Sequence, residues 1–150
     1  MIAQSESEKI TDTLIRSSLR GSALRKQAME LLDELPTYNW SGIYRLEGDT
    51  LILDEYVGAH TDHTHIPVGR GVCGTAVAEN QNQVIEDVRE LSNYLACSIQ
   101  TRSEIVVLIR QGETILGQID IDGHTVGAFD ATDESLLEAI AELLADRWLD

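Results

Sequence analysis

The chain has 150 residues, the size of one domain, and 43% of them are hydrophobic, so it can bury one sizeable core. Its formal net charge of −15 argues against nucleic acid and anionic membrane as partners, because both would repel such a surface. No apolar run is long enough to span a bilayer, and the N-terminus lacks the basic start and apolar stretch of a signal peptide, so we expect a cytoplasmic protein.

The charged residues are strongly unbalanced. Asp and Glu number 26, whereas Lys and Arg number 11, and the only lysines are Lys9 and Lys26. An acidic, lysine-poor surface favours adaptation to high salt, where charge repulsion is screened. An acidic protein of ordinary salinity is the alternative, since net charge bears on solubility rather than on fold.

Residues 1–36 predict a helical region. Between Ser5 and Leu35, apolar residues recur at helical spacing in two sets, and Gly21 between them is expected to break or bend the helix. Pro36 stops the second half. Amphipathic helices of this kind pack on a sheet or on a partner chain, so we assign them no catalytic role.

Residues 40–47 and 50–56 predict two strands joined by a turn at Gly48-Asp49. Alternation places Trp40, Gly42 and Tyr44 on one face of the first strand and Ile43 on the other. Two aromatic residues flanking a glycine fit plain core, which the residues alone favour. They also fit the floor of a small apolar pocket with a phenol donor at its edge.

A polar loop follows, with histidines at positions 60, 63 and 65. The loop lacks thiolate or carboxylate partners at a familiar metal-site spacing. We therefore expect a solvated loop rather than a metal site.

Both cysteines lie in the middle of the chain. Gly69-Arg70-Gly71 precedes a predicted short helix over 72–78, which places Cys73 in its first turn, where the helix dipole favours a thiolate. The glycines lack the further residues of a dinucleotide fingerprint or a P-loop. In a chain expected to be cytoplasmic, Cys73 and Cys97 are buried bystanders, metal ligands or redox residues rather than a disulfide scaffold.

The remaining pattern completes an α+β fold. A short strand is predicted at 83–85, and a hairpin joins strands at 103–110 and 114–122. Asp130 and Asp133 have the spacing of a capping box before the last helix. Long helices at both ends of a central antiparallel sheet make a single α+β domain over 1–150, with the helical region at 1–36 and the sheet, pocket and C-terminal helix at 39–150.

Three carboxylates are expected to converge on this hairpin. Asp120 and Asp122 are two apart on one strand, so they share a face. A tight turn at Gln111-Gly112 places Glu104 near Ile119 and Asp120. Such a cluster is tolerated when it is solvated or when it binds a metal ion or an ammonium group, and a protonated member could act as a general acid.

Several motifs together resemble the free methionine-(R)-sulfoxide reductases, which are single GAF domains. The match runs from about residue 39 to the C-terminal helix, whereas the N-terminal helices match in position only. The motifs are Asn39-Trp40-Ser41-Gly42-Ile43-Tyr44, Ile66-Pro67-Val68-Gly69-Arg70-Gly71-Val72-Cys73-Gly74-Thr75-Ala76, Ile85-Glu86-Asp87-Val88, Ala96-Cys97, Ser103-Glu104-Ile105-Val106 and Gly117-Gln118-Ile119-Asp120-Ile121-Asp122.

The resemblance implies a role for each site residue. Cys97 is the nucleophile, which attacks the sulfoxide sulfur and becomes a sulfenic acid. Trp40 and Tyr44 line the pocket around the methylsulfinyl group, with Tyr44 able to donate to the oxygen. The remaining residues, which hold the amino group of the free amino acid or help protonate the departing oxygen, are Glu104, Asp120 and Asp122. No bound cofactor or metal is implied; an external thiol, expected to be thioredoxin with its NADPH-dependent reductase, restores the protein.

The chain departs from the family pattern at two positions. His63 occupies the place of a further cysteine that often serves as the resolving thiol, and Leu108 stands where the family usually has proline. Resolution would then fall to Cys73, if its Cα lies within about 7 Å of that of Cys97, or to an external thiol. A non-catalytic GAF sensor for a small amine or amino acid is the alternative, and a metal-binding acidic protein is a third. A homodimer through the terminal helices is expected by analogy only.

Overall fold

The computed structural model describes residues 1–92, 94 and 99–150, and its centre is a six-stranded sheet in the order β3-β2-β1-β6-β5-β4. Every neighbouring pair of strands is antiparallel. The strands are β1 (Trp40–Glu47), β2 (Thr50–Val57), β3 (His65–Pro67), β4 (Gln83–Ile85), β5 (Ser103–Gln111) and β6 (Thr114–Gly123). The predicted α+β class with a central antiparallel sheet is confirmed.

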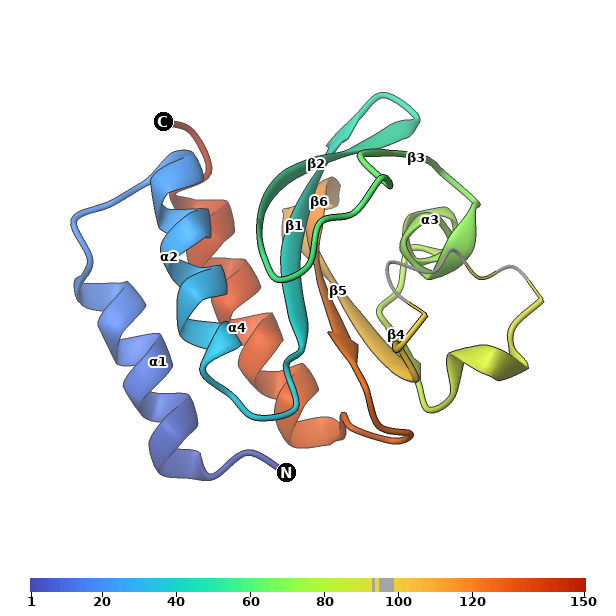
Figure 1. Ribbon diagram of the computed structural model, residues 1–150. Coiled ribbons are helices and arrows are strands. Elements are labelled where there is room, and N and C mark those ends of the chain that lie inside the picture. Colours follow the sequence, from blue (N-terminus) through green and yellow to red (C-terminus); the bar gives the residue numbers. More distant parts are fainter. Residues whose placement is uncertain (93, 95–98) are drawn as a thin grey trace.

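Three helices lie on one side of the sheet and a fourth lies on the other (Figure 1). On the first side, α2 (Gly21–Asp33) and α4 (Ala131–Asp146) pack on the strands, and α1 (Gln4–Arg16) packs on these two helices. The opposite face carries α3 (Gly71–Glu79), with the short 3₁₀ turn η1 (Val88–Glu90) beyond β4. No helix among the described residues is long and apolar enough to cross a membrane.

The larger core lies between the sheet and the three-helix layer. Ile43, Ile119 and Ile121 project into this layer and are fully buried, as strand alternation predicts. Their strand neighbours therefore project to the α3 side, where a second and smaller apolar cluster includes Trp40 and Tyr44. This division puts every predicted site residue of β1 and β6 on the α3 side.

The ends of the helices form as their sequences indicate. The N-terminal region is broken before Gly21, which adopts a φ of +60°. Asp130 caps α4 by accepting hydrogen bonds from the backbone N–H groups of Thr132 and Asp133, and the Asp133 carboxylate accepts from the Asp130 backbone N–H. The predicted aspartate form of the capping box is confirmed.

The β5–β6 hairpin departs from the predicted register. Its turn falls one residue later than expected, because Gln111 pairs with Thr114 and Gly112 takes a φ of +62°. A further irregularity follows between Ile109 and Arg110. Both shifts act in the same direction, and together they change which residues of the two strands face each other.

Candidate functional site

The site lies where α3 packs over the centre of the sheet. The glycine Gly74 lets this helix approach its preceding loop closely, since a Cβ there would lie 2.6 Å from the backbone oxygen of Pro67. Gly71, with a φ of +63°, makes the turn into the helix. Cys73 is the third residue of α3, in its first turn as predicted, and is buried against β5 and β6.

The three predicted carboxylates do converge, in a register different from the expected one. Glu104 pairs directly with Asp122, and Asp120 pairs with Val106, whereas the sequence placed Glu104 beside Ile119 and Asp120. Directly opposed residues of an antiparallel pair share a face and lie closer than diagonal ones. All three are buried, with 3%, 0% and 1% of Glu104, Asp120 and Asp122 exposed. The alternative of a solvated acidic end of the hairpin is therefore wrong.

Burial controls the protonation of this cluster. Desolvation raises the pKa of Glu104 well above its usual range, and the negative charges of Asp120 and Asp122 raise it further. Desolvation also raises the pKa of Asp120, although hydrogen bonds from Glu104 and from the Cys73 thiol act in the opposite direction. The two shifts favour a proton on Glu104, which would relieve the repulsion among the three carboxyls.

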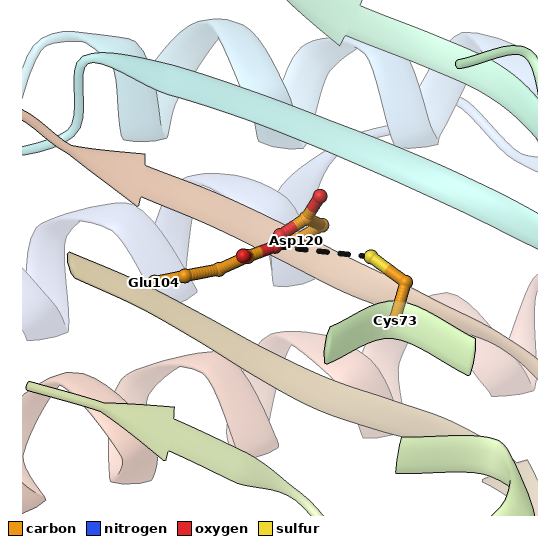
Figure 2. A group of neighbouring side chains, drawn as sticks. All are labelled: Cys73, Glu104 and Asp120. Atoms are coloured by element: carbon orange, nitrogen blue, oxygen red, sulfur yellow. Dashed lines mark hydrogen bonds between the residues drawn. The ribbon is translucent and has the colours of Figure 1, made fainter. Parts of the chain in front are cut away.

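Cys73 completes the cluster (Figure 2). Its thiol donates to Oε2 of Glu104 over 3.8 Å. Ligand atoms of Cys73, Glu104 and Asp120 all lie within 4.8 Å of one another. The group could in principle hold a cation, and the neighbouring carboxylates oppose the thiolate that the helix dipole was expected to favour.

A narrow cavity opens beside these residues, with room for about one water molecule. It is bounded by the α3 N-terminus, the carboxyl cluster and the loop before β3. Its lining residues are His63, Ile66, Arg70, Gly71, Val72, Cys73, Glu104 and Asp120. His63 is half-buried here, whereas His60 and His65 are exposed, as expected of a solvated loop.

Trp40 and Tyr44 lie on the predicted face, yet neither belongs to that lining. The Trp40 ring lies over Gly42, stacks on Tyr56 with centroids 5.5 Å apart, and donates its indole N–H to the Ala59 carbonyl. The Tyr44 hydroxyl donates to the backbone carbonyl of His63 over 2.8 Å. Donation to a sulfoxide oxygen would therefore compete with this bond.

Comparison with known proteins places the chain in a family. The GAF domain family model matches residues 19–147. A free methionine-R-sulfoxide reductase of Escherichia coli is 44% identical over 114 residues, which cover 75% of this chain and 68% of the relative. The chain belongs to the free methionine-R-sulfoxide reductase family of GAF domains.

Solved structures of this reductase family have the same fold. The reduced form of the Staphylococcus aureus reductase superposes with a TM-score of 0.86 and is 36% identical, covering 95% of this chain and 94% of that one. The Neisseria meningitidis reductase, solved in complex with its substrate, superposes with a TM-score of 0.87 at 29% identity, covering 99% and 92%. The GAF architecture expected from the motifs is therefore confirmed.

One of the predicted site residues has no described position. Cys97, the expected nucleophile, lies outside the described residues, so its distance from Cys73 stays a prediction. Gln118, which was not predicted as a site residue, is fully buried on the face shared by Asp120 and Asp122. The same two-residue alternation that grouped the aspartates would have found it.

Proposed function

We propose that the protein reduces free methionine-(R)-sulfoxide to methionine, with residues 1–150 acting as one domain. The observation that carries the proposal is the set of three buried carboxyl groups, two of which, Glu104 and Asp120, border a cavity about the size of a water molecule. An ammonium group has nearly that size, donates three hydrogen bonds and brings the positive charge that converging carboxylates lack. A free amino acid carries such a group, whereas a methionine residue inside a protein does not.

The chemistry requires two thiols in succession. The Cys97 thiolate attacks the sulfoxide sulfur, and the protonated sulfoxide oxygen leaves as water when the S–O bond of the substrate breaks. Water then attacks the Cys97 sulfur and breaks the bond between the two sulfur atoms, which releases methionine and leaves Cys97 as a sulfenic acid. The Cys73 sulfur then attacks the Cys97 sulfur, forming a disulfide and releasing the oxygen of the sulfenic acid as water. Two electrons pass from the protein to the substrate, and a dithiol reductant returns them by disulfide exchange.

The surroundings of Cys73 suit a resolving thiol. It is buried, and its thiol donates a hydrogen bond to a Glu104 carboxyl oxygen 3.8 Å away, the group nearest to take the thiol proton when the sulfur attacks. Glu104 can act in this way once it has given up its own proton. With His63 at the position of the family's further cysteine, Cys73 is the protein's own candidate for this step.

The proposal extends to the reductant, the compartment, the assembly and the substrate contacts. The reductant is thioredoxin with its NADPH-dependent reductase, and the protein acts in the cytoplasm as a homodimer. Trp40 and Tyr44 surround the methylsulfinyl group, with Glu104, Asp120 and Asp122 around the ammonium. The acidic surface keeps the protein in solution at high salt.

The test is NADPH oxidation with thioredoxin and its reductase, at low and high salt, with each epimer of free methionine sulfoxide. We expect turnover of the R epimer, none with Cys97→Ser, and a rate at least 100-fold lower with the N-acetylated substrate, because its amide has lost the ammonium charge. If the folded protein consumes no R epimer even with dithiothreitol as reductant, it is no reductase.

A GAF sensor for a small amine or amino acid is the second candidate. The observation that favours it is His63 in place of the further cysteine. Calorimetric titration separates the two functions, because a sensor would bind the free amino acid and consume no reductant.

A further inference from the structure

Gln118 lies in the centre of β6 and is completely buried. It pairs with Tyr44 of β1 on one side and with Leu108 of β5 on the other. Both neighbours belong to the apolar cluster beneath α3. A long polar side chain in this position is unusual, since a leucine or methionine would fill the same space at no polar cost.

The amide of Gln118 is only half satisfied. Its Nε2 donates to the backbone oxygen of Cys73 over 3.4 Å, which is a long hydrogen bond. Its Oε1 is buried and has no hydrogen-bond partner among the described residues. A buried acceptor without a partner destabilises the folded protein, so the residue costs stability that an apolar side chain would not.

Residues that lower stability without a structural gain are typical of functional sites. Among the described residues, the only side-chain hydrogen bond of Gln118 is the one to the backbone of Cys73. Gln118 thus holds Cys73 at its carbonyl oxygen, while Glu104 and Asp120 contact its sulfur. These contacts come from β5 and β6, and together they fix the first turn of α3 on the sheet.

We propose that Gln118 is a positioning residue, which holds the first turn of α3 so that the Cys73 sulfur stays beside Glu104, ready to attack the Cys97 sulfenic acid. This inference rests on the proposed function in one respect, the role of Cys73 as resolving thiol. It adds a residue that touches neither substrate nor the reacting sulfur atoms.

The test uses Gln118→Met, which keeps the length of the side chain and removes both polar atoms, with Gln118→Leu as a second variant. We expect a melting temperature equal to or above that of the wild type, because the buried acceptor is gone. In a Cys97→Ser background, alkylation of Cys73 by iodoacetamide should become at least threefold faster, because the turn that buries its thiol has lost a point of attachment.

The two chemical steps should respond differently to Gln118→Met. Formation of one methionine per protein in a single turnover should stay within twofold of the wild type, because it involves Cys97 alone. The following conversion of sulfenic acid to disulfide should slow at least fivefold, as followed by trapping with dimedone. Hydrogen peroxide can form the sulfenic acid without the sulfoxide, so this step is measurable even in a protein that reduces no sulfoxide.

Gln27→Met is the matched control. Gln27 lies on α2, on the far side of the sheet, and its Oε1 is also buried without a partner among the described residues. This variant should raise stability in the same way and leave Cys73 alkylation unchanged.

The inference is overturned if alkylation of Cys73 or the disulfide step in Gln118→Met stays within twofold of the wild type. Gln118 is then a core residue only. Failure of the proposed function looks different, because the wild type would reduce no sulfoxide while Gln118→Met still altered Cys73 alkylation and the peroxide-driven step.

Discussion

The thiol of Cys73 donates to Oε2 of Glu104, 3.8 Å away, although α3 and β5 are separated in the chain by β4 and η1. The Cys73 sulfur and a buried carboxyl are thus held together by tertiary packing. The carboxyl belongs to a group of three whose burial is unfavourable for folding and favourable for binding a cation.

Glu104→Gln should make the protein more stable at neutral pH. Burial and two neighbouring carboxyls raise the pKa of Glu104, so the folded state binds its proton more tightly than the unfolded state does. A protein with such a carboxyl loses stability as the pH rises from the pKa of the group in the unfolded state, about 4.3, towards its raised pKa in the folded state. The amide removes that loss by staying neutral.

Urea unfolding between pH 5 and pH 8 measures this effect. The wild type should lose stability across the range, whereas Glu104→Gln should have a flatter profile and a higher midpoint at pH 8. Glu142→Gln, on the exposed side of α4, is the control and should follow the wild type. A wild-type midpoint that rises with pH would contradict the assignment of the proton to Glu104.

Cys73→Ser should separate the two chemical steps of the proposed reaction. One methionine per protein should still form, because the first step uses Cys97 alone. Thioredoxin-dependent turnover should fall at least tenfold, since a hydroxyl cannot form the disulfide that thioredoxin opens. Rapid-quench analysis of methionine formation, beside steady-state NADPH oxidation, measures both rates. Unchanged turnover would mean that an external thiol resolves the sulfenic acid directly.

Gly42→Ala should weaken substrate binding by displacing Trp40. A Cβ at Gly42 would lie 2.3 Å from the Trp40 ring, and the ring must move because the Gly42 backbone is held in β1 between two strands. We expect the KM for the sulfoxide to rise about tenfold with kcat within threefold. The neighbouring Ser41→Ala is the control, because Ser41 lies on the other face of β1. Equal KM values in the two variants would show that Trp40 does not line the substrate pocket.

Asp130→Ala should destabilise α4 by about 1 kcal/mol, the usual cost of losing an N-cap. Hydrogen bonds from Thr132 and Asp133 lower the pKa of Asp130 to about 2. A lowered folded pKa gives stability that is present above the unfolded pKa, about 3.9, and is lost as the pH falls towards 2.

Thermal melts at pH 7 and pH 2.5 measure the difference between the two proteins. The difference in melting temperature between the wild type and Asp130→Ala should be large at pH 7 and smaller at pH 2.5. A gap that widens on acidification would show that the cap does not depend on the charge of Asp130.

The sequence by itself determined the features that depend on short-range rules. Asp130 and Asp133 are three residues apart and cap α4 wherever that helix packs. Asp120 and Asp122 project to the face opposite that of Ile119 and Ile121, because side chains alternate along any strand. The sequence motifs were long enough to predict the family, which the comparisons confirm.

Only the tertiary structure decided which of these groups meet. The pairing of Glu104 with Asp122 depends on a turn one residue later than predicted and on an irregularity near Ile109, and small local energies select among such registers. The contacts of Cys73 with Glu104 and Gln118 depend on how α3 packs across β5 and β6. The physical reason is that local patterns fix the direction in which a side chain points, whereas the packing of the whole core fixes the distance to its partner.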